Sequence, residues 1–203
     1  MKKLIIFLLM CMPMAALAQN NWELNDEPKP ESVKVNPDEK YLTGAVPEVD
    51  GKVVFHTTIS APGKSADMIY STLLNYIDRM TKADNQIENS RVVLNDPAKH
   101  EIAAYFQEWL IFTSNAITLD RTRFRFTLIV NCQDGSADVT MKRISYLYEE
   151  ERKPQDLKAE DWITDKVAVN KKGTKLYPIT AKFRRKTIDR KDFIFNKFEE
   201  LLK

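Results

Sequence analysis

One stretch of the chain restricts the fold more than any other, because its side chains alternate between apolar and polar. This stretch is RTRFRFTLIVNC, residues 121–132. One side carries Phe124, Phe126, Leu128, Val130 and Cys132, and the other carries Arg121, Arg123, Arg125, Thr127 and Asn131, with Ile129 the exception. A period of two residues is typical of a strand. Apolar residues on one side and polar residues on the other predict an antiparallel sheet with one face open to water.

Four other segments have strand character. DGKVVFHTTIS begins at residue 50, RVVLN at 91, EIAAYFQEWLIF at 101 and ADVTMKRISYLY at 137. The turn Gln133-Asp134-Gly135 joins two of these strands as a hairpin, because glycine readily adopts the positive φ that such turns need. The sequence therefore predicts about five strands.

Two helices are predicted, one before and one after the four consecutive strands in the sequence. Ser65 can cap the first, and its apolar stripe is Ile69, Leu73, Tyr76, Ile77 and Met80. Thr187 or Asp189 can cap the second, whose stripe is Ile194, Phe198, Leu201 and Leu202. The predicted fold class is α+β with the order β-α-β-β-β-β-α. A polar excursion, residues 149–175, precedes the last helix, and in it QDLKAEDW favours a short helix after Pro154.

The N-terminus has the pattern of a secretory signal peptide. Two lysines precede an apolar run, Leu4–Met12, and an A-L-A tripeptide at 16–18 matches a cleavage site. The run is shorter than the roughly 20 residues that span a membrane. We therefore expect residues 1–18 to be removed during export to the periplasm or the exterior, with no transmembrane segment in the mature chain. The alternative is a lipoprotein with its lipid on Cys11, but Met10 stands where a small residue is expected.

If the signal peptide is removed, the charge and the cysteine count of the mature chain differ from those of the full sequence. Without the signal peptide the chain has 29 basic and 29 acidic residues and one cysteine, Cys132. A neutral, exported chain lacks the basic excess that binding to nucleic acid requires. A lone cysteine forms no internal disulfide, so stability must come from the core. Residues 20–40 contain three prolines and many charges, so 19–45 are predicted to be a flexible arm and 46–203 a single domain.

A basic run near the C-terminus, residues 180–195, raises the question of an anionic partner. Its sequence is TAKFRRKTIDRKDFIF. We interpret Arg184, Arg185 and Lys186 as a strand or loop that precedes the last helix. Nearby acids, such as Asp189, Asp192 and Glu149 to Glu151, are their natural partners. The favoured interpretation is a solvated surface of mixed charge.

Motifs of catalysis and metal binding are scarce. Neither His56 nor His100 has a second ligand at zinc-binding spacing, the five glycines are scattered, and G-x-S-x-G does not occur. Cys132 lies on the apolar side of its strand, as a buried free thiol does. No catalytic residue, metal or cofactor is assigned. Glu108 shares strand parity with apolar residues, so it is either a buried acid, a residue returned to solvent by a bulge, or the partner of a buried arginine.

The chain also resembles a known family. GKVVFHTTISAPGKSADMIYSTLLNYI resembles the opening strand and helix of an uncharacterised family of exported bacterial proteins, described as a domain of unknown function with a TATA-binding-protein-like (TBP-like) fold. FTLIVNCQDGSADVTMKRISY resembles its central hairpin, and AEDWITDK and KFRRKTIDRKDFIF its C-terminal part. The resemblance runs from about Val46 to the end. It implies a single curved antiparallel sheet with two main helices on one face, and no activity.

The open sheet face is the candidate interaction surface. We predict that it carries Arg121, Arg123, Arg125, Lys142, Tyr105 and Trp109. Arginine with aromatic residues favours a non-enzymatic module that binds an envelope protein, or an anionic glycan or lipid headgroup. These residues could also serve only to keep the sheet soluble. Two other classes stay open, a small hydrolase that uses carboxylates and an envelope assembly factor that acts through the arm.

Overall fold

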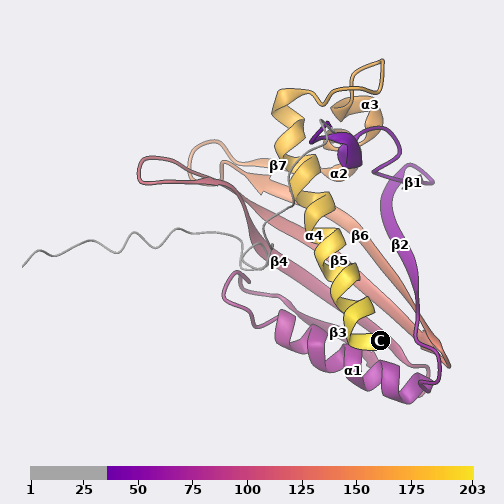
Figure 1. Cartoon of the computed structure of the whole chain (residues 1–203). Helices are drawn as coiled ribbons and strands as arrows, with labels where there is room; N and C mark the ends of the chain where they lie inside the picture. The colour runs from indigo at the N-terminus through magenta and orange to yellow at the C-terminus, as the bar shows by residue number, and fades with distance from the viewer. Residues whose placement is uncertain (1–35) are drawn as a thin grey trace, which may run out of the picture.

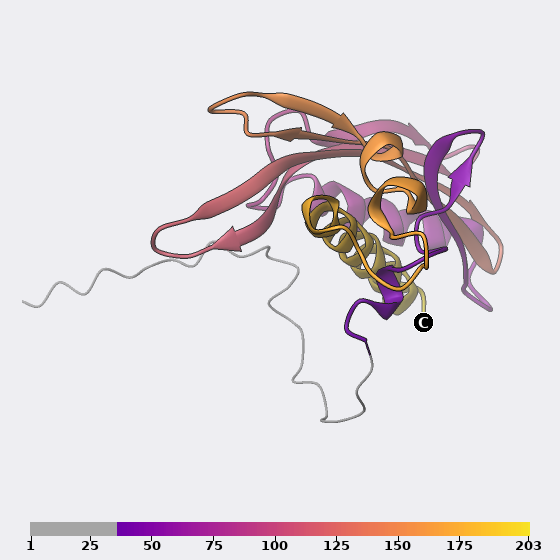
Figure 2. The ribbon, with the colours of Figure 1, turned by 90° about the horizontal axis from the view of Figure 1, so that it is seen from above.

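The computed structural model describes residues 36–203, and these form one antiparallel sheet with two main helices on one face (Figure 1). The predicted signal peptide and residues 19–35 of the predicted arm lie outside the described residues. Figure 2 shows the curved sheet as one layer and the helices as a second layer below it. This arrangement confirms the predicted α+β class and leaves the opposite sheet face free of helices.

The sheet has seven strands, two more than predicted. They run in the order β1-β2-β6-β5-β4-β3, and β7 pairs with a second part of β6. The additional strands, β1 and β7, are the shortest. The bounds are β1 Glu48–Val49, β2 Lys52–Ser60, β3 Arg91–Asp96, β4 Glu101–Ser114, β5 Leu119–Gln133, β6 Ser136–Tyr148 and β7 Gln155–Lys158.

Helix α1 (Ala66–Met80) confirms its prediction in detail. The Ser65 hydroxyl accepts a hydrogen bond from the Met68 amide at 3.3 Å, which satisfies one of the unpaired N–H groups of the first turn. Ile69, Leu73 and Ile77 are buried against the sheet. The apolar stripe read from the sequence is therefore the surface by which α1 packs on the core.

Helix α4 (Pro178–Leu202) begins about ten residues earlier than predicted. Pro178 occupies the first turn, where a missing N–H costs nothing. The prediction that Arg184–Lys186 form a strand or loop was wrong, because these residues lie inside the helix. Arg184 and Arg190 are buried and occupy positions that an apolar residue would usually take, so they concealed the helical period.

The excursion after β6 was also assigned incorrectly in part. Residues 155–158 form β7 rather than the start of a helix, and only Ala159–Trp162 are helical, as α2. A second short helix, α3 (Asp165–Ala168), follows and leads toward α4. In this way the excursion extends the edge of the sheet at β6 and closes one end of the core.

A bulge in β6 preserves the two faces of the sheet. Arg143 has a positive φ of 57°, and the pairing of β5 with β6 shifts by one residue there. Before the bulge the odd-numbered residues are buried, as Val139 and Met141 are; after it the even-numbered Ile144 and Tyr146 are buried. One extra residue therefore keeps apolar side chains on the helix side along the whole of β6.

Residues 36–45, which the sequence assigned to the arm, pack against α4. They include a 3-10 helix, η1 (Glu39–Tyr41), and Tyr41 is buried. The fully buried Arg184 donates hydrogen bonds of 2.5 and 2.6 Å to the carbonyl oxygens of Tyr41 and Leu42. Arg185 forms two more bonds with the Asp38 carboxylate. The arginines of the basic run therefore hold the segment that precedes β1.

Candidate functional site

The six residues of the predicted interaction face lie on the helix-free side of three adjacent strands. Thr127 on β5 lies between Tyr105 on β4 and Lys142 on β6, and it is the cross-strand partner of both. Trp109 on β4 is the cross-strand partner of Arg123 on β5. Arg121 and Arg125 occupy the same side of β5, because residues two apart on a strand share a face. The structure thus brings these side chains onto one surface; whether that surface binds a partner stays a prediction.

The arginines of this face have acidic partners inside the chain. Arg123 makes two hydrogen bonds to the Glu150 carboxylate, at 3.0 and 2.5 Å. Arg125 lies 3.5 Å from Asp156, and Arg121 lies 3.6 Å from Glu151. These acids follow β6 or lie on β7, in the excursion. Because each arginine is neutralised locally, the face does not present the strong positive charge that its sequence suggested.

One end of the face is hollowed. Here the β4–β5 hairpin and the connection between β6 and β7 both extend beyond the rest of the sheet (Figure 2). This hairpin hollow has a volume of about 390 Å³ and is lined by Trp109, Leu119, Arg121, Leu147 and residues 149–152. The Arg121 guanidinium carbon lies 3.7 Å from the centre of the Trp109 ring, a cation–π stack. The hollow combines an aromatic surface, two aliphatic side chains and charges of both signs.

The tip of the β4–β5 hairpin exposes apolar side chains beside this hollow. Ile117 is 96% exposed and Leu119 is 51% exposed. The tip is held in a turn by Asn115, whose side-chain oxygen accepts hydrogen bonds from the amides of Ile117 and Thr118. The exposed Ile117 at this turn therefore places apolar surface next to the hollow, where a bound partner could contact it.

Glu108 is fully buried in an ion pair with Arg190, which is one of the outcomes left open by the sequence. The two side chains form two hydrogen bonds of 2.7 and 2.8 Å. Gln86 donates a third bond to the carboxylate at 2.6 Å. With its oxygens occupied in this way, Glu108 has the surroundings of a structural group rather than of an accessible acid.

The other residues considered for chemistry lie apart from one another. Cys132 is a buried free thiol, and burial raises its pKa to about 11, which disfavours the nucleophilic thiolate. His56 is exposed on β2, and its nearest acid is Asp138 at 3.8 Å. Within residues 36–203, no group of three or more His, Cys, Asp or Glu side chains is placed to hold a metal ion.

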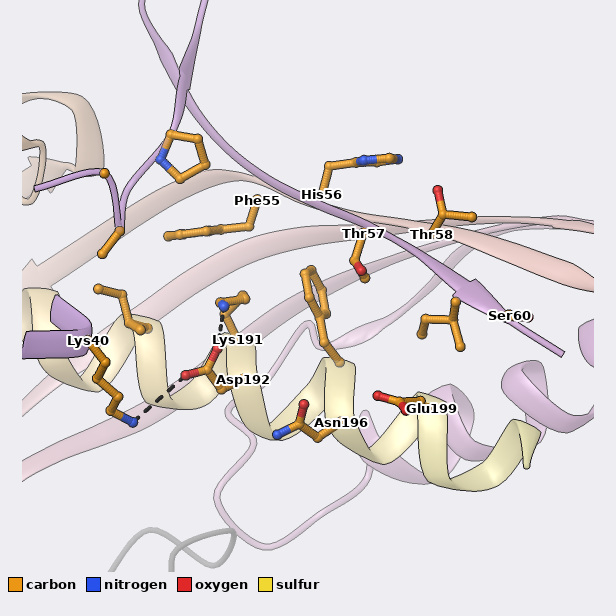
Figure 3. A pocket seen from close by; sticks show the side chains of 16 residues that line it. Lys40, Phe55, His56, Thr57, Thr58, Ser60, Lys191, Asp192, Asn196 and Glu199 are labelled. Carbon is orange, nitrogen blue, oxygen red and sulfur yellow. Dashed lines mark hydrogen bonds and ion pairs between the residues drawn. The ribbon is translucent and has the colours of Figure 1, made fainter.

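A second concave region lies on the helix side, between β2 and α4 (Figure 3). This β2–α4 groove has a volume of about 840 Å³ and is lined by Lys40, residues 55–60 and α4 side chains between Ile188 and Glu199. Phe55 and Thr57 point toward the helix, while His56 and Thr58 lie on the other side of the strand. Sequence reasoning missed this groove, because its walls come from segments more than 120 residues apart.

The fold and these surfaces can be compared with known proteins. A family model described as a domain of unknown function (DUF4468) with TBP-like fold matches residues 55–147. A crystal structure of a DUF4468 family protein from Bacteroides ovatus is 42% identical over 83% of this chain and 96% of that one, with a TM-score of 0.76. The chain belongs to the DUF4468 family.

A second solved structure supports the fold alone. A TBP-like protein from Parabacteroides distasonis is 19% identical, covers 77% of this chain and 96% of its own, and has a TM-score of 0.64. A comparison with curated proteins found no match. These relatives confirm the TBP-like fold that the sequence predicted, and the family description names no activity. No helix within residues 36–203 has both the length and the apolar character needed to cross a membrane.

Proposed function

We propose that this DUF4468 protein is a non-enzymatic protein-interaction module of the bacterial cell envelope, and that it contacts its partner through the hairpin hollow. The observation that carries the proposal is the Trp109–Arg121 stack, at 3.7 Å, in a hollow bordered by the exposed Leu119. Tryptophan and arginine are the residue types that contribute most to binding energy in protein interfaces.

The charges of the hollow favour a protein over an anionic glycan or a lipid headgroup. Glu149, Glu150 and Glu151 line the same hollow as Arg121. A phosphate or sulfate placed there would meet carboxylates as well as guanidinium groups. A protein surface can instead match both signs of charge around an apolar centre, which is the usual composition of an interface with a polar rim.

The two other classes receive less support. A carboxylate-dependent hydrolase needs two accessible acids with an open position between them, and Glu108, the acid that the sequence singled out, is enclosed by Arg190 and Gln86. An assembly factor that acts through the arm stays a prediction for residues 20–35. Residues 36–41 are engaged in contacts with α4.

Export remains part of the proposal. It is supported by the basic, apolar and small-residue pattern of residues 1–18. The compartment is proposed to be the periplasm or the exterior, with the lipoprotein form through Cys11 as the alternative. Mass spectrometry of the protein isolated from cells tests both: an N-terminus at Gln19 supports simple export, and a lipid on Cys11 or an uncleaved Met1 contradicts it.

The experiment for the hollow is a cross-linking pull-down from the cell envelope of the producing organism. The wild-type protein is compared with Trp109→Ala and Arg121→Glu, with bound proteins identified by mass spectrometry. We expect a specific partner to be lost in both variants, while thermal unfolding shows that each variant remains folded.

Lys142→Glu is the matched control, because Lys142 lies on the same face but does not line the hollow. It should retain the partner. If Lys142→Glu also loses the partner, the binding site includes the rest of the open face as well as the hollow. A partner that Trp109→Ala and Arg121→Glu both retain, or the absence of any partner, would overturn the proposed site.

A further inference from the structure

One edge of the sheet has backbone groups without partners. The Val54 amide donates to Pro47, away from β6, and the Ala61 amide donates to Gly135, on the side of β6. The backbone N–H and C=O groups of successive residues in a strand point to opposite edges. The odd-numbered residues Phe55, Thr57 and Ile59 therefore direct these groups toward β6. The even-numbered residues His56, Thr58 and Ser60 direct theirs toward the open edge. Among the described residues, nothing hydrogen-bonds the outward N–H and C=O groups of these three.

The opposite edge, at β3, is protected in ways that β2 is not. A bulge lies between Val92 and Leu94, charged Arg91 and Asp96 stand at the ends of β3, and Pro97 follows it. Bulges, charges and prolines at an edge discourage pairing with another chain. The β2 segment 54–60, VFHTTIS, has no bulge and no lysine, arginine, aspartate or glutamate, and the proline that follows it, Pro62, lies beyond the residues that would pair. The β2 edge is therefore less protected against pairing with another strand than the β3 edge.

We infer that this edge pairs with β2 of a second copy of the chain, in antiparallel orientation about a two-fold axis at Thr58. In this register Thr58 lies opposite Thr58 of the second copy, and His56 lies opposite Ser60. The three outward residues of each copy then exchange hydrogen bonds as in an ordinary antiparallel ladder. The turn at Pro62-Gly63 ends the pairing just beyond Ser60. The two sheets become one continuous sheet.

The side chains fit a self-pairing strand. On the open face the opposed residues are threonine, serine and histidine, so no two permanent like charges meet, and opposed threonines are a favourable cross-strand pair. On the helix side the β2–α4 groove leaves space beside Phe55 and Thr57 for side chains of the second strand. The edge is thus compatible with its own copy both in hydrogen bonding and in shape.

The two ends of the groove carry charges of both signs, so they do not repel a second copy. Toward the Phe55 end, Lys40 and Lys191 lie beside Asp192, which forms an ion pair with Lys191 (Figure 3). Toward the Ser60 end, Glu199 lies 3.2 Å from the Lys203 ammonium group. Since these charges are already paired within one copy, the hydrogen bonds of the β2 edge and the fit of its side chains favour the second copy.

The mass of the purified protein in solution, measured by light scattering over a concentration series, tests the inference. We expect a dimer that dissociates on dilution. Thr58→Pro removes an outward N–H from each copy, and proline is tolerated at such an edge position, so association should weaken about tenfold or more. Thr58→Val is the control, because it loses the hydroxyl bond to Asp138 but keeps the N–H. It should leave the dimer intact.

A charge exchange tests the two-fold position itself. Thr58→Lys and Thr58→Glu place like charges opposite each other in their own dimers, so each variant alone should be monomeric. An equal mixture should form a mixed dimer. A wild-type monomer at all concentrations, or a dimer that Thr58→Pro and both charged variants leave unchanged, would overturn the inference. Trp109→Ala should not affect the dimer, so this result is separate from that for the hairpin hollow.

Discussion

The arginines of α4 and those of β5 differ in what surrounds them, although both groups come from basic stretches of similar composition. Arg184 and Arg190 on α4 are buried, and each has fixed partners in the core. Arg121, Arg123 and Arg125 on β5 are partly exposed and face acids at the surface. The basic run at residues 180–195 was predicted to be a solvated surface, but two of its arginines lie in the core. The arginines of β5 lie on the accessible face of the sheet.

The comparison shows that the cost of losing a charge depends on what is left behind. Removing a buried arginine leaves carboxylate or carbonyl groups without a partner in a region that water does not reach. Removing a surface arginine lets water solvate its former partner. We therefore expect the two groups of arginines to separate clearly in their effects on the free energy of unfolding.

The largest effect is expected for Arg190→Met. It leaves Glu108 buried without its charged partner, and we expect the free energy of unfolding to fall by about 3–5 kcal/mol, as measured by urea denaturation. The double variant Arg190→Met with Glu108→Leu should recover most of this loss, since neither charge is then buried alone. A single-variant loss below about 1 kcal/mol would contradict the role of the pair.

A smaller effect is expected for Arg184→Met. Arg184 bonds the carbonyls of Tyr41, Leu42 and Ile163 as well as Asp165. Their loss should lower the free energy of unfolding by about 2–3 kcal/mol and speed amide hydrogen exchange in residues 36–45. Lys197→Met, on the surface of the same helix, is the control and should change neither quantity. Unchanged exchange in residues 36–45 would show that other contacts hold this segment.

Arg123→Met should have a modest effect on stability. The Arg123–Glu150 pair is partly exposed, so we expect the free energy of unfolding to fall by less than about 1 kcal/mol, and by less still in high salt. Denaturation at two salt concentrations measures both quantities. A loss as large as that of Arg190→Met would mean that the open face supports the fold rather than presenting a surface.

The smallest effect concerns pH and the surface arginine of α4. The hydrogen bonds from Arg185 lower the pKa of Asp38 below its ordinary value of 3.8. A lowered pKa means that the pair stabilises the fold above pH 3.8 and that this contribution is lost as the pH falls through the folded-state pKa. Acid unfolding of the wild type should therefore be slightly steeper in this range than that of Asp38→Asn. Identical acid profiles would contradict the contribution of Asp38.

The strands and α1 could be predicted because their local pattern and their burial agree. Phe124, Phe126 and Leu128 alternate with polar residues in the sequence and are buried in the structure. The start of α4 could not be predicted, since Arg184 and Arg190 take core positions only through partners far away in the sequence. Arg190 and Glu108, for example, are 82 residues apart. Local periodicity contains no information about such a partner.

The candidate sites were predictable to a different extent. The side of β5 that carries Arg121, Arg123 and Arg125 follows from strand parity, so the open face was predicted correctly as a surface. The acids that neutralise it were not, because β7 and the connection before it fold back beside β6. The β2–α4 groove required the strand order, which places β2 beside β6 and leaves its other edge open. Topology of this kind cannot be read from one segment at a time.

The bonds from Arg184 to Tyr41 and Leu42 also bear on the order in which the chain is completed. They join residues that are 143 and 142 positions apart in the sequence. A ribosome synthesises Tyr41 long before Arg184. The segment at residues 36–45 therefore gains this anchor only after more than 140 further residues have been made. A chain that stops before Arg184 lacks these bonds, so we expect residues 36–45 of such a chain to be more open to proteases than those of the full chain.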